Sequence, residues 1–267
     1  MSENGTTSSS TDAAAADGAL IQCRGLHKRF GPQVVLDGLD LEIHKGETLV
    51  VLGHSGTGKS VLLKHINGLL EPDAGSVWFE GTDLSTLSEA ELVPVRRKIG
   101  MLFQMGAMFD SLDVESNVAF GLDEHRLASG EERNRRVAEL LEVVSLAGTE
   151  HKMPSELSGG MRKRAALART LALDPEVILY DEPTTGLDPV TGQQINVLIR
   201  DLQGKFGLTS IVVTHDLASA YYVADRIAFL YHGRIRRVGT VEEMRAETDP
   251  MIREFLTAGA TSSEPAG

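Results

Sequence analysis

The stretch GHSGTGKS, residues 53–60, limits the possible folds of this chain more than any other segment. Its pattern, G-x-x-x-x-G-K followed by Ser or Thr, works only between a buried strand and the start of a helix. The apolar run LVVLG at 49–53 predicts that strand, and apolar periodicity from Lys59 to Leu70 predicts that helix. Backbone N–H groups of such a loop hold phosphate, while the lysine reaches the terminal phosphates and the last hydroxyl ligates Mg²⁺. We therefore predict a nucleotide site formed by Gly53, His54, Ser55, Gly56, Thr57, Gly58, Lys59 and Ser60.

Three later apolar runs also predict buried strands: VILYDE at 177–182, SIVVTHD at 210–216 and RIAFLYHGRI at 226–235. A helical pattern from Val190 to Phe206 separates two of them. Alternating strands and helices favour a largely parallel sheet, so the predicted class is α/β.

The segment from about 86 to 173 has a helical pattern instead. Ser129 and Glu132 have the spacing of a capping box, and Gly148 marks the expected end of that segment. The next strand is expected only at Val177, so this stretch predicts an inserted helical lobe that interrupts the sheet. Its apolar stripe, expected to face the core, is Val137, Leu140, Leu141 and Val144.

Polar side chains follow two of the predicted strands. Asp181 ends the strand at 177, Glu182 comes next, and His215 ends the strand at 210. Alone, such residues are more often helix caps, turn residues or structural histidines. With a phosphate loop at the same sheet edge, we expect Asp181 to hold Mg²⁺ and Glu182 to orient or deprotonate the attacking water.

Composition narrows the functional classes. The net charge of −12 would repel a nucleic-acid backbone, and no apolar run is long enough to span a bilayer. The single cysteine, Cys23, favours a reducing compartment and a buried structural thiol. The start of the chain lacks the pattern of a secretion signal, so we expect a cytosolic protein or one attached to a membrane through a partner. Residues 1–18 and 258–267 have the composition of disordered tails around a folded unit at 19–257.

A second glycine-rich segment is LSGGMRKRAAL at 157–167, where a serine and two glycines open a predicted helix. Free backbone N–H groups there are suited to an anion. Together with the phosphate loop, Gln104, LYDEPTTGLDP and the strand ending at His215, this segment resembles the ATP-binding subunit of ABC transporters over about residues 20–245. The resemblance implies ATP and Mg²⁺ as ligands, ATP hydrolysis, and a RecA-like core with an antiparallel β portion near the N-terminus and an inserted helical lobe.

The resemblance also implies roles for individual residues. Phe30 matches the aromatic side chain that stacks on adenine, although an aromatic there is more often a core residue. Gln104 matches the glutamine that contacts Mg²⁺ and water, and His215 matches the switch histidine. The signature segment of the family corresponds to Ser158, Gly159 and Gly160, which would complete the ATP site of a second copy in a head-to-tail dimer. Asp188 matches the loop that communicates across that dimer.

Two variable segments narrow the resemblance to a subgroup. MGAMFDSLDVESNVAF follows Gln104, and the signature reads LSGGM where the commoner family pattern has glutamine. Both are similar to the subgroup serving Mce and Mla lipid systems. This implies phospholipid transport with an integral membrane permease and an Mce-type substrate-binding protein, at the cytoplasmic face of the inner membrane. Met101, Met105, Met108 and Phe109 could receive a partner helix, although methionine clusters are more often core.

Two other readings remain open, and the first of them shares every ATP-site residue. One is the cassette of an importer for amino acids or another small solute. The other, less favoured because the chain is acidic and has no internal repeat, is an ABC ATPase acting on nucleic acid or the ribosome. The apolar segment at 251–256 would either dock on its own domain or cross to a second chain.

Overall fold

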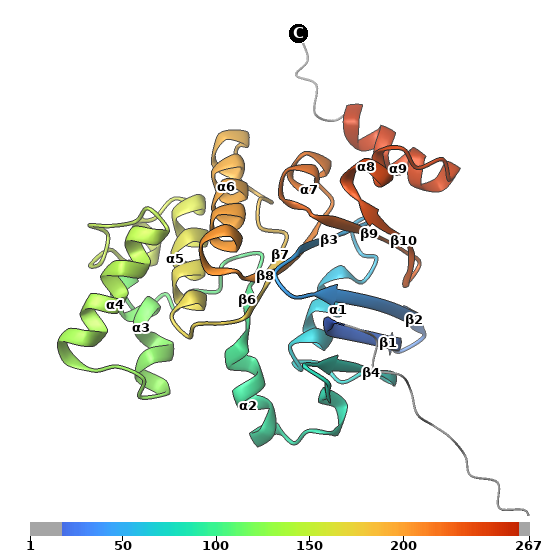
Figure 1. The fold of residues 1–267 in the computed structure, drawn as a ribbon. Coiled ribbons are helices and arrows are strands. Elements are labelled where there is room, and N and C mark those ends of the chain that lie inside the picture. Colours follow the sequence, from blue (N-terminus) through green and yellow to red (C-terminus); the bar gives the residue numbers. More distant parts are fainter. Residues whose placement is uncertain (1–17, 262–267) are drawn as a thin grey trace, which may run out of the picture.

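Two β-sheets and the helices that cover them make up the structure (Figure 1), which is a computed structural model. It describes the backbone of residues 18–261 and the side chains of residues 18–257. The strands are β1 (Ala19–Phe30), β2 (Gln33–His44), β3 (Thr48–Leu52), β4 (Ala74–Phe79), β5 (Thr82–Asp83), β6 (Ile99–Leu102), β7 (Val177–Asp181), β8 (Thr209–Thr214), β9 (Arg226–Tyr231) and β10 (Arg234–Thr240). The α-helices are α1 (Lys59–Ile66), α2 (Glu89–Lys98), α3 (Val114–Glu124), α4 (Gly130–Val143), α5 (Gly159–Leu171), α6 (Pro189–Phe206), α7 (Leu217–Val223), α8 (Val241–Arg245) and α9 (Pro250–Thr261), with short 3₁₀ turns at Leu84–Thr86 and Pro154–Glu156.

The central sheet has the strand order β10-β9-β3-β8-β7-β6. All of its neighbours pair in parallel except β9 and β10, which form an antiparallel hairpin. The central strands are apolar at nearly every position because both faces of the sheet are covered. The α/β class and the mostly parallel sheet are confirmed.

The second sheet is antiparallel, in the order β2-β1-β4-β5. One hydrophobic core lies between it and the central sheet and includes Leu62, Leu63 and Ile66 of α1. On β3, Leu49 and Val51 face this core, whereas Val50 and Leu52 face the opposite core, as strand alternation requires. The expected antiparallel portion near the N-terminus is thus confirmed.

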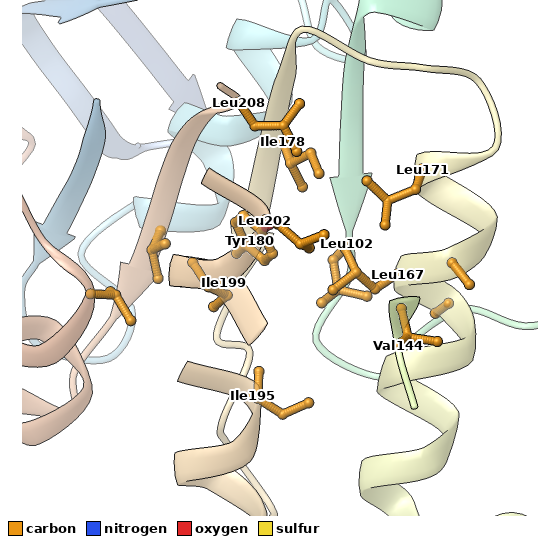
Figure 2. Close-up of a cluster of buried hydrophobic side chains, with 14 of the residues drawn as sticks. Leu102, Val144, Leu167, Leu171, Ile178, Tyr180, Ile195, Ile199, Leu202 and Leu208 are labelled. Atoms are coloured by element: carbon orange, nitrogen blue, oxygen red, sulfur yellow. The ribbon is translucent and has the colours of Figure 1, made fainter. Parts of the chain in front are cut away.

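The opposite core lies between the central sheet and helices α3 to α7. Figure 2 shows Ile199 and Leu202 of α6 lying near Tyr180 of β7, with Leu102 of β6 and Leu167 of α5 on the other side. The predicted stripe at Val137, Leu140, Leu141 and Val144 is fully part of this core. The helical stretch is therefore attached to the sheet by an apolar face.

Strand β6 corrects the expectation that residues 86–173 interrupt the sheet. Its four residues, IGML, pair in parallel with β7 at the sheet edge. A strand so short, with a glycine inside, has no distinguishing periodicity. Gly100 is required there because a Cβ atom would lie 2.4 Å from Thr170 Cγ2 on α5, so the tertiary contact explains the residue.

Three other local predictions need correction. The run at 226–235 begins with a buried strand, β9, as predicted, but His232 and Gly233 take positive φ angles and turn the chain into a second strand, β10. Ser129 begins α4 but its side chain accepts no hydrogen bond from the helix, so the capping box does not form. That helix ends at Val143, before Gly148.

The C-terminal segment docks on its own domain. Ile252 and Phe255 of α9 are buried in the core beside α7, and the Phe255 ring lies 4.8 Å from the ring of His54. α9 continues to Thr261, four residues past the expected end of the folded unit. The tails predicted at 1–18 and 258–267 fall largely outside the described residues, which exclude 1–17 and 262–267. Within the described part of the chain, no helix combines the length and apolarity needed to cross a membrane.

Candidate nucleotide-binding site

The phosphate loop connects the end of β3 to the start of α1, as its sequence requires. Gly56 and Gly58 have φ angles of 78° and 100°, values that other residues rarely adopt. A Cβ atom at Gly58 would also lie 2.9 Å from Val35 Cγ1, so no other residue fits this approach. Within the described residues, no side chain caps the first turn of α1. Its N–H groups are therefore available to an anion.

The lysine of this loop is nearly enclosed. Lys59 is 5% exposed, and its Nζ donates to the carbonyl oxygens of Gly53 at 2.7 Å and His54 at 3.0 Å. Glu182 Oε1 lies 3.6 Å from the same nitrogen. Burial lowers the pKa of Lys59, and the nearby carboxylates of Glu182 and Asp181 oppose that shift. The ammonium is thus held at the mouth of the loop, where terminal phosphates would lie.

Ser60 and Asp181 meet beside it. Ser60 Oγ donates to Asp181 Oδ1 at 2.7 Å, which joins the first turn of α1 to the end of β7. Burial raises the pKa of Asp181 above its usual range. Among the described residues, no group of three or more His, Cys, Asp or Glu could hold a metal ion by itself. A hydroxyl beside one carboxylate instead suits Mg²⁺, which keeps several waters and also binds substrate phosphates.

The second carboxylate oxygen of Glu182 contacts three further side chains. This atom, Oε2, accepts from Thr185 Oγ1 at 3.1 Å and Thr214 Oγ1 at 3.3 Å, and lies 3.0 Å from His215 Nδ1. The parallel register places the ends of β7 and β8 side by side, which brings Glu182 and His215 together. The carboxylate is 12% exposed, so one edge remains open to the pocket.

A pocket of about 480 Å³ unites most of the predicted residues. Its wall combines the end of β1, the phosphate loop and the ends of β7 and β8. The predicted residues lining it are Phe30, Ser55, Gly56, Gly58, Lys59, Ser60, Gln104, Glu182 and His215. Phe30 is 48% exposed at its rim, so it is a surface aromatic and not a core residue.

The second glycine-rich segment lies elsewhere. Ser158, Gly159 and Gly160 do not line this pocket; they begin α5, and Ser158 Oγ accepts from Met161 N at 3.3 Å. A Cβ atom on Gly160 would lie 2.3 Å from Thr191 Cγ2, so α5 abuts the start of α6. Asp188 caps that helix by accepting from Val190 N, Thr191 N and Thr191 Oγ1.

Sequence reasoning missed the residues that support Glu182. Thr185 and Thr214 bind its carboxylate, and the Lys163 ammonium binds the backbone around it. Thr185 belongs to LYDEPTTGLDP, but nothing in that segment says which threonine turns toward the carboxylate. Lys163 could have been recognised from the sequence as a positive residue among the apolar positions of α5, where it lies between Gly160 and Ala165.

The methionine cluster divides between core and surface. Met101 lies in β6, where its sulfur accepts from Asn67 Nδ2 at 3.2 Å, and Met108 packs on the helical core. Met105 is 85% exposed and Phe109 is 42% exposed. Phe109 stacks on Phe120 of α3, with ring centroids 4.5 Å apart.

The phosphate loop between β3 and α1, with carboxylates at adjacent strand ends, defines a P-loop nucleoside triphosphatase. Residues 36–185 match the family described as ABC transporter.

The probable ribonucleotide transport ATP-binding protein mkl of Mycobacterium leprae is 43% identical over 239 residues, 90% of this chain and 69% of that protein. The intermembrane phospholipid transport system ATP-binding protein MlaF of Haemophilus influenzae is 42% identical over 237 residues, 89% and 90% of the two chains. The methionine import ATP-binding protein MetN of Rhizobium johnstonii is 40% identical over 252 residues, 94% of this chain and 69% of that protein.

A solved structure agrees with these relatives. The dimeric post-hydrolysis state of the ATP-binding cassette MJ0796, bound to ADP and Pi, has a TM-score of 0.76 and 34% identity, over 83% of this chain and 98% of that one. The chain belongs to the ABC transporter family, and it is an ATP-hydrolysing subunit of that family.

Proposed function

We propose that this chain binds and hydrolyses ATP to power phospholipid transport across a bacterial envelope. The observation that carries the substrate class is the 42% identity to a phospholipid transport subunit, over about nine tenths of both chains. The LSGGM signature and the segment after Gln104 support the same subgroup. Binding of ATP and its hydrolysis would drive a conformational cycle that a membrane partner can use.

The pocket suits ATP in one orientation. Phe30 at the rim would stack on adenine, and the N–H groups of Gly53 to Ser60 would bind the phosphates. Lys59 would exchange its carbonyl partners for the terminal phosphates. Ser60 and Asp181 would hold Mg²⁺, and Gln104, which also lines the pocket, would contribute to its binding. Bound Mg²⁺ would neutralise charge developing on the phosphates.

Hydrolysis in this site depends on Glu182. Its carboxylate, oriented by Thr185, Thr214 and His215, is placed to accept a proton from a water that attacks the terminal phosphate. His215 would contact that phosphate and hold the carboxylate between turnovers. These roles follow the pattern that the resemblance implies.

A second copy would complete each site. Ser158, Gly159 and Gly160 lie outside the pocket of their own chain, although their N–H groups suit an anion. Two chains packed head to tail would place this signature on the ATP of the partner. The dimer of the related cassette MJ0796 supports this arrangement.

We assign the chain to the cytoplasmic face of the inner membrane, held there by an integral permease. The exposed surface of Met105, Phe109 and Phe120 is where a permease helix would dock. An Mce-type protein would carry the lipid on the far side of the membrane. An amino-acid importer is the second candidate, since a methionine import subunit is 40% identical.

Purification with the native membrane partners tests the substrate class. We expect a permease, an Mce-type protein and phospholipid, identified by mass spectrometry of the intact complex and its lipid extract. A soluble amino-acid-binding protein or a ribonucleotide-binding partner in place of the lipid would overturn the proposal. ATP hydrolysis by the purified complex, stimulated by phospholipid vesicles, provides the functional readout.

A further inference from the structure

Lys163 on α5 is a buried lysine that the roles above leave unused. Its side chain is 6% exposed, although lysine is almost never buried without partners. Its Nζ donates to three backbone carbonyls: Pro183 and Thr185 at 2.8 Å, and Glu182 at 3.3 Å. All three carbonyls belong to the loop that carries Glu182 away from β7.

This contact requires an ammonium. A lysine head group brings three N–H donors to one point, whereas glutamine offers two and arginine spreads its donors across a plane. Burial lowers the pKa of Lys163 to about 8, and the Glu182 carboxylate opposes the shift. Lys163 is therefore still charged near pH 7, with every donor engaged.

The loop is also held at its start, because Glu182 N donates to Val213 O of β8 at 3.0 Å. Glu182 has a φ angle of 48°, in the left-handed region, and no helix or strand pairs its carbonyl. The carbonyl of Glu182 accepts only from Thr185 N, at 3.2 Å, besides Lys163, among the described residues. Thr185 in turn binds the carboxylate of Glu182 through its hydroxyl. Lys163 thus binds the backbone of this loop, and the position of that backbone determines where the Glu182 carboxylate lies.

The same helix begins at the signature. Ser158 caps α5, and Lys163 lies in its second turn, so one short rigid segment joins Ser158 to the loop of Glu182. Gly160 also abuts Thr191 of α6, which ties the start of α5 to the Asp188 cap. A shift of the signature would therefore move the Glu182 loop through Lys163.

We propose that Lys163 is a positioning residue that fixes Glu182 of its own chain from the signature helix, and so links the two ATP sites of a dimer. The inference rests on the proposed function, because it needs Glu182 to act in hydrolysis and the signature to bind the ATP of a second copy. Lys163 acts on Glu182 of its own chain and not on Glu182 of the partner chain.

Mixed dimers of the full chain, purified through two different tags, test whether Lys163 acts within its own chain. The first pairs a Lys163→Met chain with a Glu182→Gln chain, so the one remaining Glu182 sits beside the substituted lysine. The second pairs a Lys163→Met, Glu182→Gln chain with an unaltered chain, so the same substitutions leave the remaining Glu182 beside an intact lysine. We expect kcat of the first to be lower by about 10-fold or more, with KM for ATP within about 2-fold.

Further variants separate positioning from general damage. Lys163→Gln, with two donors, should retain more activity than Lys163→Met, while Lys205→Met removes an exposed lysine of α6 and should leave kcat unchanged. Circular dichroism and ATP affinity confirm folding of each chain. Equal kcat in the two mixed dimers, with inactive Glu182→Gln homodimers, overturns the Lys163 inference alone. Hydrolysis at the wild-type rate by Glu182→Gln homodimers overturns the role of Glu182 and the inference together.

Discussion

Ser60 Oγ donates a 2.7 Å hydrogen bond to Asp181 Oδ1, although the two residues are 121 positions apart in the sequence. The bond joins the first turn of α1, where Ser60 lines the pocket, to the end of β7. Asp181 is 7% exposed, and burial raises the pKa of its carboxyl group while the hydrogen bond from Ser60 opposes that shift. A divalent cation would favour the ionised carboxylate.

Because the pKa of Asp181 is raised in the folded chain, the folded state loses stability as pH rises from the unfolded pKa to the folded pKa, and the loss is complete at pH values above both. Asp181→Asn should therefore raise the thermal midpoint at pH 7 without Mg²⁺, by about 2–4 °C for each kcal/mol recovered. It should also abolish the stabilisation that Mg²⁺ and ATP give the unaltered chain. A midpoint that falls in Mg²⁺-free buffer would contradict the burial argument. Ser111→Ala, at an exposed serine, is the control.

Glu182→Gln should preserve ATP binding and nearly eliminate turnover. The amide keeps the shape and the hydrogen bonds from Thr185 and Thr214 but cannot accept a proton from water. We expect kcat to fall by about 100-fold or more, within the range of an essential general base. Light scattering should then show an ATP-dependent dimer. A protein that stays monomeric with saturating ATP, even in the partner complex, would refute the shared site.

Gly160→Ala should destabilise the protein, since the new Cβ atom would lie 2.3 Å from Thr191 Cγ2. Overpacking of this kind costs about 1–3 kcal/mol. Thr191→Ser removes that methyl group while keeping the hydroxyl that donates to Asp188 at 2.6 Å. The double variant should recover most of the loss in urea unfolding. If Thr191→Ser gives no recovery, the contact is not what requires glycine.

Two serines at helix starts should differ in their contribution to stability. Ser88 forms a complete capping box with Glu91 at the start of α2, whereas the Ser129 side chain caps nothing at the start of α4. Ser88→Ala should cost about 1 kcal/mol, and Ser129→Ala only a few tenths. Both serines are exposed, so packing changes little. Chemical denaturation of the two variants measures the difference, and equal losses would contradict the assignment.

Cys23 should resist thiol reagents in the native protein. It is 2% exposed in β1, and burial raises the pKa of its thiol to about 12. Because the thiolate is the reactive form, alkylation at pH 8 should be very slow and should follow unfolding. One equivalent should react in denaturant. Rapid labelling of the folded chain would show that β1 opens locally.

Local sequence patterns were sufficient for much of this molecule. The glycine spacing of residues 53–60 predicts a strand, a phosphate loop and a helix in that order. Only this order leaves the N–H groups of the loop free to bind phosphate. Continuous apolar runs determine the buried strands β7 and β8, and Asp181, Glu182 and His215 follow at their ends. The parallel pairing of those strands then brings Glu182 within 3.0 Å of His215.

Other features depend on contacts between distant segments. Strand β6 pairs with β7 although its four residues show no strand pattern, and Gly100 is needed because α5 approaches it. The choice of Thr185 and Thr214 as partners of Glu182, and of Lys163 as the support of its backbone, has no local signature.

The sequence by itself determined the chemistry of the loop and strand ends, because that chemistry depends on residue type and spacing. The tertiary structure alone decided which side chains hold those groups, because hydrogen bonds and close packing depend on where the folded backbone places each atom.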